Sequence, residues 1–132
     1  MKNKRYINLI YVPNMVQLNM KIITVNFYKS AQGRELVRDW LKELSKENKV
    51  IIGQDIKTVE FGWPLGMPLV RKLDKHLWEV RCQLMNKEIA RILFTVKGET
   101  MVLLHGFIKK TQKTPSSDLD IAKERRDRVL SG

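Results

Sequence analysis

Two neighbouring stretches of strict alternation constrain the fold of this chain more than any other feature. In "LWEVRCQL" (77–84) and in "EIARILFTV" (88–96) an apolar residue returns at every second position. This period of two is typical of a strand that turns one face to a core. Only Met85 and the turn-like "NK" (86–87) separate the two stretches, and only "KGE" (97–99) and Thr100 precede a third apolar run, "MVLLHGFIK" (101–109). Links this short predict an antiparallel meander of three strands.

The alternation also assigns side chains to the two faces of this meander. One face carries Trp78, Val80, Ile92 and Phe94, which are expected to form the core. In the third strand a strict period of two puts five residues on one side, namely Met101, Leu103, His105, Phe107 and Lys109. The face away from the core is expected to carry Arg81, Arg91, His105 and Lys109. Because like charges on neighbouring strands repel, a phosphate backbone would relieve such a cluster.

The first part of the chain predicts a strand followed by two helices. "KIITVNFY" (21–28) is rich in β-branched and aromatic residues and is expected to be a buried strand. Ser30 is a candidate helix cap, and a helical apolar stripe follows it, made of Leu36, Val37, Trp40, Leu41 and Leu44. After a break at "SKENK" (45–49), a second helix carries Ile52, Ile56 and Val59 until "GWPLGMP" (62–68) ends it.

A third helix is expected at the C-terminal end. "SDLD" (117–120) is a variant of the S-x-x-E helix-capping signature, and a narrow apolar edge follows, made of Leu119, Ala122, Val129 and Leu130. The resulting order of elements is β-α-α-β-β-β-α. Helices grouped ahead of an antiparallel sheet indicate an α+β domain in which the helical hairpin covers one sheet face.

The charge of the chain favours a polyanionic partner. Twenty-five Lys and Arg residues against fourteen Asp and Glu give a formal net charge of +11. Between Met67 and Lys113, ten basic residues stand against four acidic ones, so this segment alone carries a net charge of +6. Such an excess favours nucleic acid, an acidic protein or an anionic membrane surface, and the anion site is expected in the second half of the chain.

Composition limits the other classes of function. A length of 132 residues fits one domain. Cys82 is the only cysteine, so an internal disulfide is excluded, and its apolar surroundings favour a small buried side chain over a nucleophile. This cysteine usage favours a cytoplasmic location. With two histidines and no paired ligand spacing, neither a metal site nor another cofactor is expected.

Residues 1–19 are expected to be an N-terminal extension outside the domain, which covers 20–132. The apolar stretch from Tyr6 to Val12 is interrupted by Asn8 and is too short to span a bilayer, and no small-residue cleavage site follows it. No membrane association is therefore expected. Met20, which opens "MKIITVNFY", is a candidate for the true start of the native product.

Each basic candidate also has a simpler interpretation. Arg81 can pair with Asp74 or Glu88, His105 can be a hydrogen-bonded strand residue, and the lysines of "HGFIKKTQKTP" (105–115) can be a solvated exit from the sheet. Arg91 is flanked by apolar residues, so its charge is costly unless an anion lies nearby. The residues alone therefore predict a small α+β domain with a cationic sheet face suited to RNA or DNA. They do not predict whether the domain catalyses a reaction.

Three segments carry a resemblance to a known group of proteins. At "RKLDKHLWEVR" (71–81), "ARILFTV" (90–96) and "LLHGFIKKTQKTP" (103–115) the sequence resembles the HigB-like, phage-derived branch of the RelE toxin superfamily. The likeness runs from about Met20 to the C-terminus. It implies a RelE-like fold and an mRNA interferase that cleaves mRNA in the ribosomal A site without a metal. The partner that it implies is a cognate antitoxin, expected to be a helix-turn-helix protein.

The resemblance also implies residue roles. In such toxins a 2′-OH attacks the adjacent phosphate and leaves a 2′,3′-cyclic phosphate and a 5′-OH. By position, Arg91 is expected to clamp the scissile phosphate, Arg81 to stabilise the transition state, and Lys109 or Lys110 to bind phosphate or protonate the leaving oxygen. The tyrosine that some members use near the C-terminus is absent, which leaves the proton-transfer assignment open, and His105, with Glu79 behind it, is one candidate base. Further RNA contacts are expected from Arg71, Lys72, Lys113, Arg125 and Arg126.

Two rival functions stay open. A non-catalytic nucleic-acid-binding module, which includes a degenerate toxin, would bind RNA and leave it intact. A protein that docks an acidic partner through its basic face would have no RNA affinity of its own. Trp78 and Phe94 fall on the predicted core face, so the aromatic platform on which single strands usually stack is not evident.

Overall fold

The computed structural model describes residues 10–12, 15–17, 21–109 and 113–132. β1 (Ile10–Val12) and β2 (Met15–Gln17) pair with each other in a separate antiparallel sheet. The main body comprises β3 (Thr24–Phe27), α1 (Leu36–Lys42), α2 (Lys46–Gly62), β4 (Val70–Asp74), β5 (Leu77–Gln83), β6 (Ile89–Lys97), β7 (Thr100–Lys109) and α3 (Ser116–Ser131). A single 3₁₀ turn, Met85–Lys87, joins β5 to β6. The α+β class predicted from the sequence is confirmed.

The main sheet has five strands in the order β3-β7-β6-β5-β4. Strands β5 to β7 form the expected antiparallel meander and β4 pairs antiparallel with β5, whereas β3 runs parallel to β7. The prediction of a purely antiparallel sheet is therefore wrong at this edge. It also missed β4, which forms within the link after α2 and pairs with β5 across a tight turn at His76, where φ is 55°. Arg71 and Lys72 interrupt the apolar pattern of β4, and this hid the strand.

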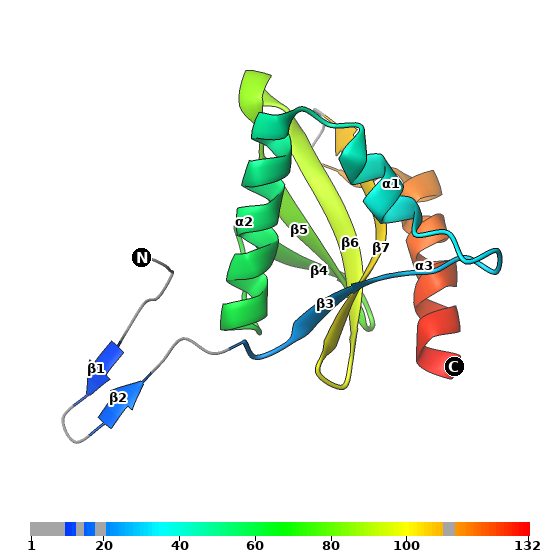
Figure 1. Ribbon diagram of the computed structural model, residues 1–132. Coiled ribbons are helices and arrows are strands. Elements are labelled where there is room, and N and C mark those ends of the chain that lie inside the picture. Colours follow the sequence, from blue (N-terminus) through cyan, green and yellow to red (C-terminus); the bar gives the residue numbers. More distant parts are fainter. Residues whose placement is uncertain (1–9, 13–14, 18–20, 110–112) are drawn as a thin grey trace.

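Helices cover both faces of the sheet (Figure 1), with α2 and α3 on opposite sides. On the side of α1 and α2, the core joins helix residues Ile52, Ile56 and Val59 to sheet residues Val80, Cys82, Ala90, Ile92 and Phe94. On the other side, α3 contributes Leu119, Ala122 and Val129 against Leu77, Leu93 and Leu104. The expectation that only the helical hairpin covers the sheet was thus incomplete, since α3 covers part of the face predicted to be open.

A β-bulge in β7 sets which side chains reach the second face. Leu93 of β6 pairs with His105, but the next residue, Phe94, pairs with Leu103, so Leu104 is an extra residue in β7. Met101 and Leu103 consequently pack in the core beneath α1 and α2, whereas His105 lies opposite Leu93 on the α3 side. The prediction that Met101, Leu103, His105, Phe107 and Lys109 share one side is wrong for this reason. The predicted grouping of His105 with the arginine face is confirmed.

The helix boundaries differ from the expected ones for local reasons. Ser30 does not cap α1; its hydroxyl accepts the Arg34 N–H in a turn that precedes the helix. The predicted break at "SKENK" is the start of α2, where the Ser45 hydroxyl accepts the Asn48 N–H at 3.2 Å as an N-cap. α3 starts one residue before Ser117, at Ser116, with Pro115 as the N-cap residue and no side-chain cap hydrogen bond. Within the described ranges, no helix has the length and apolar character needed to cross a membrane.

Candidate functional site

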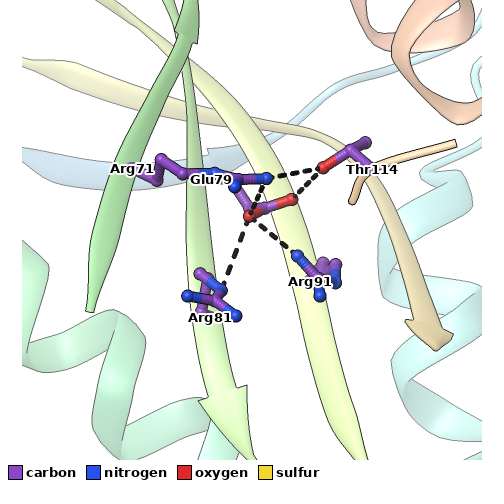
Figure 2. Close-up of polar contacts among 5 residues, drawn as sticks. All are labelled: Arg71, Glu79, Arg81, Arg91 and Thr114. Atoms are coloured by element: carbon purple, nitrogen blue, oxygen red, sulfur yellow. Dashed lines mark hydrogen bonds and ion pairs between the residues drawn. The ribbon is translucent and has the colours of Figure 1, made fainter. Parts of the chain in front are cut away.

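Three arginines from adjacent strands meet at one carboxylate on the α3 side of the sheet. Arg71 lies on β4, Glu79 and Arg81 on β5, and Arg91 on β6. The strand register brings them together, because Arg71 is paired with Glu79 and Arg81 with Arg91. Figure 2 shows the guanidiniums of all three pointing at Glu79. The Oε1 atom of Glu79 lies 3.3 Å from Arg91 NH1, 3.5 Å from Arg71 NH2 and 3.9 Å from Arg81 Nε.

The cluster is buried at one end and open at the other. The side chains of Glu79 and Arg91 are 0% exposed, that of Arg81 is 12% exposed and that of Arg71 is 31% exposed. Among these four side chains, three positive charges surround one negative charge, an excess of two. A group that enters from solvent therefore meets Arg71 and Arg81 first, and an anion is the group that this excess would attract.

Thr114 completes the cluster from a different part of the chain. Its side chain is buried, and its hydroxyl donates to Glu79 Oε2 at 2.6 Å while it accepts from Arg71 NH2 at 3.2 Å (Figure 2). The residue lies just before α3, whereas its partners lie on β4 and β5. Both oxygens of Glu79 thus receive donors, and the approach to α3 is tied to the arginines.

The interior position of Arg91 bears on its expected role as the phosphate clamp. Burial lowers the pKa of the Arg91 guanidinium, Glu79 raises this pKa, and the charges of Arg81 and Arg71 lower it. An arginine nevertheless keeps its charge at neutral pH, so the pair with Glu79 is ionic. Because the Arg91 side chain is fully buried, it contacts Glu79 and has no surface for a phosphate in this arrangement.

His105 belongs to a second polar pair on the same sheet face. Its Nε2 lies 2.7 Å from Asp118 Oδ1 in the first turn of α3. The carboxylate behind His105 is therefore Asp118 and not Glu79, as was expected. Glu79 and His105 flank Leu93 from the two neighbouring strands, so their backbones are separated by two strand spacings, roughly 10 Å. An ionised Asp118 selects the tautomer protonated at Nε2 and leaves Nδ1 as the basic nitrogen.

The predicted lysines that the structure describes are exposed, and they do not all lie on the face of the arginine cluster. Lys109 ends β7 and is exposed, and Lys113 is exposed before α3. Lys110 lies outside the described residues. Lys72 is exposed on β4, with its Nζ 5.9 Å from the centre of the Trp78 ring. Trp78 itself packs on the α2 side beside Trp63 and Phe94, as predicted.

The arginines of α3 are engaged in contacts within the protein. Arg125 NH1 donates to the Leu104 carbonyl oxygen at 2.7 Å, and its guanidinium lies over the Tyr28 ring. Arg126 NH1 donates to Asp74 Oδ2 at 2.7 Å and to the Lys75 carbonyl oxygen at 2.8 Å. These contacts fasten α3 to β7 and to the β4–β5 turn. The predicted RNA contacts of Arg125 and Arg126 would therefore compete with bonds that hold the fold.

Sequence reasoning did not single out Thr114 or Asp118 as site residues. Thr114 had no signal beyond its place after the lysines, and Asp118 was counted only as part of the capping pattern. Cys82, in contrast, is 0% exposed as expected of a core residue, and burial raises the pKa of its thiol well above the ordinary range. Across the described ranges, no three His, Cys, Asp or Glu side chains gather into a metal-binding group.

Comparison with known proteins assigns the chain to a family. No curated protein matches the sequence. The family described as "Phage derived protein Gp49-like (DUF891)" matches residues 39–127, about two thirds of the chain. The match spans α2, the strands β4 to β7 and most of α3, and it includes the arginine cluster, Thr114, His105 and Asp118. The chain therefore belongs to the Gp49-like family of phage-derived proteins.

Proposed function

We propose that this protein is the toxin of a type II toxin–antitoxin pair, of the HigB-like branch, and that it is an endoribonuclease that cleaves mRNA held on the ribosome. Membership of the Gp49-like family, whose proteins are of the RelE toxin type, supports the toxin part of this proposal. The observation that carries the enzymatic part is the meeting of Arg71, Arg81 and Arg91 on one carboxylate, with positive charge in excess at a partly exposed point.

The proposed reaction needs cations around a phosphate that gains negative charge. The side chains of Arg81 and Arg71 keep 12% and 31% of their surfaces exposed, so they are assigned to the phosphate oxygens, which a guanidinium binds with two parallel hydrogen bonds. Arg91 supports them from the interior through Glu79. Stabilisation of this kind by one donor is typically worth ~3–4 kcal/mol in the transition state.

The proposed proton transfers use the other polar pair and the lysines. His105 Nδ1 takes the proton of the 2′-OH while Asp118 holds Nε2, and the 2′ oxygen then bonds to phosphorus. The bond from phosphorus to the 5′ oxygen breaks, and Lys109 or Lys110 supplies the proton of the leaving 5′-OH. The products are a 2′,3′-cyclic phosphate and a 5′-OH, and no metal or other cofactor takes part in this scheme. Lys113 is assigned to a flanking phosphate, whereas Lys72 points to the α2 side of the sheet, away from the arginine cluster.

The proposed partners follow from the same charge. The ribosomal A site presents the mRNA, and a cognate antitoxin of the helix-turn-helix type neutralises the toxin in the cytoplasm. A net charge of +11 suits both an RNA substrate and an antitoxin that carries acidic groups.

The test maps the 5′ ends of a reporter mRNA treated with the purified protein, with and without translating ribosomes. The wild type is compared with Arg81→Ala and with Arg34→Ala, an exposed arginine in the β3–α1 loop that pairs with Asp39. The expected result is ribosome-dependent cuts with 5′-OH ends, slowed about 10²–10³-fold in Arg81→Ala and unchanged in Arg34→Ala.

Other outcomes separate the rival functions. Intact mRNA under every condition, together with salt-sensitive RNA binding, would identify a non-catalytic binding module. The absence of RNA affinity would identify a protein that docks an acidic partner. Equal cleavage by wild type and Arg81→Ala would remove the arginine cluster from the active site.

A further inference from the structure

We infer that Glu79 is the internal counter-anion of the RNA-binding surface: it positions the three arginines for phosphate and weakens the binding of RNA. The inference deepens the proposed function and rests on it. Glu79 differs from an ordinary rim carboxylate because its side chain is completely buried, while two of its three arginine partners reach solvent.

Glu79 lies where the strand register brings like charges together. Arg81 and Arg91 are paired across β5 and β6, and like charges placed directly opposite each other repel. Glu79 lies on the same face two residues before Arg81, and its Oε1 lies within 3.9 Å of all three guanidiniums. One oxygen atom therefore holds together three cations that would otherwise separate.

The orientation of the Glu79 carboxylate is fixed by contacts at both of its oxygens. Its other oxygen, Oε2, accepts the Thr114 hydroxyl at 2.6 Å, and that hydroxyl accepts from Arg71. With both oxygens fixed, the carboxylate cannot rotate to favour one arginine. Replacing the glutamate should misplace the guanidiniums even if the strands stay intact, because a phosphate site depends on preorganised donors.

Glu79 also lowers the net positive charge of the cluster. Glu79 offsets one of the three positive charges at the point where RNA is proposed to bind. Its loss leaves the same arginines with one more uncompensated charge for phosphate, so binding should tighten while cleavage slows. A glutamate that served only the fold would not separate these two quantities, since misfolding weakens both.

Glu79→Gln and Glu79→Asp test the inference, with Glu60→Gln as the matched control. Glutamine keeps the size of Glu79 and removes its charge; aspartate keeps the charge and shortens the reach. Glu60 is also buried and ion-paired, but with Lys21 beside β3, so Glu60→Gln makes the same charge change away from the cluster.

RNA binding is measured as a function of salt, with an RNA oligonucleotide in which 2′-deoxy sugars prevent cleavage. For Glu79→Gln we expect a salt slope steeper by about 0.7 and an affinity about fivefold higher at 0.1 M salt, the effect of one additional phosphate contact. Glu79→Asp and Glu60→Gln should keep the slope of the wild type. A slope for Glu79→Gln equal to that of Glu60→Gln would overturn the inference.

Cleavage of ribosome-bound mRNA supplies the second readout. Both Glu79 variants should lower kcat at least tenfold, while KM falls only in Glu79→Gln; undiminished kcat in both would also overturn the inference. Thermal unfolding identifies variants that fail to fold. If Glu79→Gln fails to fold, the inference is overturned when Glu79→Asp cleaves with the same kcat as the wild type. A wild type that binds RNA and never cleaves it would contradict the proposed function, and the salt slopes would still decide whether Glu79 is the counter-anion.

Discussion

His105 on β7 and Asp118 on α3 form a hydrogen bond of 2.7 Å that joins the last strand to the C-terminal helix. Both side chains are largely buried, with 17% and 19% of their surfaces exposed. If His105 is the base, Asp118→Asn should slow cleavage about 10²-fold, the lower end of what acid–base catalysis contributes, because an amide no longer selects the tautomer with a basic Nδ1. The dependence of the cleavage rate on pH measures this effect.

Asp120→Asn is the matched control for this prediction. Asp120 is exposed near the start of the same helix, so the change in helix charge is the same and no histidine contact is lost. Equal rates for Asp118→Asn and the wild type would assign His105 a structural role.

Arg91→Ala is expected to damage the fold as well as the activity. From the sequence alone, loss of Arg91 would abolish cleavage and leave the fold intact, but the structure shows its guanidinium completely buried against Glu79. Removing one partner of a buried ion pair typically costs about 3–5 kcal/mol, so Tm should fall by about 10 °C or more. Arg81→Ala should cost less, since its side chain keeps 12% of its surface exposed and its contact with Glu79 is longer, at 3.9 Å. Thermal denaturation of the two variants side by side measures the difference, and equal losses would contradict it.

Gly106→Ala should destabilise the contact between α1 and β7. A Cβ atom at Gly106 would lie 2.5 Å from Cζ3 and 2.6 Å from Cε3 of the Trp40 ring. Overpacking of this kind costs about 1–3 kcal/mol. Gly53→Ala is the control, because a Cβ there meets nothing within 4 Å and alanine suits the interior of α2, with an expected gain of about 0.5–1 kcal/mol. Chemical denaturation measures both, and a neutral Gly106→Ala would mean that the indole moves without cost.

Asp55→Asn should raise stability at neutral pH. Burial raises the pKa of Asp55 above its ordinary value of 3.8, although a hydrogen bond from the Cys82 thiol opposes this shift. The folded protein therefore bears a cost for the ionised group, which is fully present above the folded pKa and disappears as pH falls through that pKa towards 3.8. The variant avoids this cost, so Tm should rise at pH 7 by on the order of 2 °C.

The gain in Asp55→Asn should shrink as the pH is lowered to 4, because the native carboxyl is then becoming protonated. Scanning calorimetry of both proteins at several pH values checks the sign. A gain that grows with acidity would contradict the assignment of the raised pKa to Asp55.

Alternation predicted the faces of β5 and β6 because each strand keeps a regular period of two. Val80, Cys82, Ile92 and Phe94 all lie in the core beneath α1 and α2, as expected. The arginines on the other face also followed from this period. The residues of a single strand predict which of its faces is buried, but they do not predict the strand with which it pairs. The parallel contact of β3 with β7 depends on residues far apart in the chain and has no local signature.

The candidate site was predicted less completely than the sheet. Arg71, Arg81 and Arg91 were named from the sequence, but their meeting at Glu79 depends on β4, a strand whose charged residues concealed it. The bulge at Leu104 is one extra residue, and no pattern of polarity marks it. The burial of Arg91 depends on tertiary packing, which a strand pattern alone cannot supply.

Thr114 lies just before α3, and Asp118 lies four residues later in the first turn of that helix. Thr114 holds the arginine cluster through Glu79, and Asp118 holds His105. The phosphate-binding half and the proton-transfer half of the proposed site are thus both bonded to the start of α3. A ligand that pulls this segment off the sheet would disconnect both halves in one movement, without touching any of the three arginines.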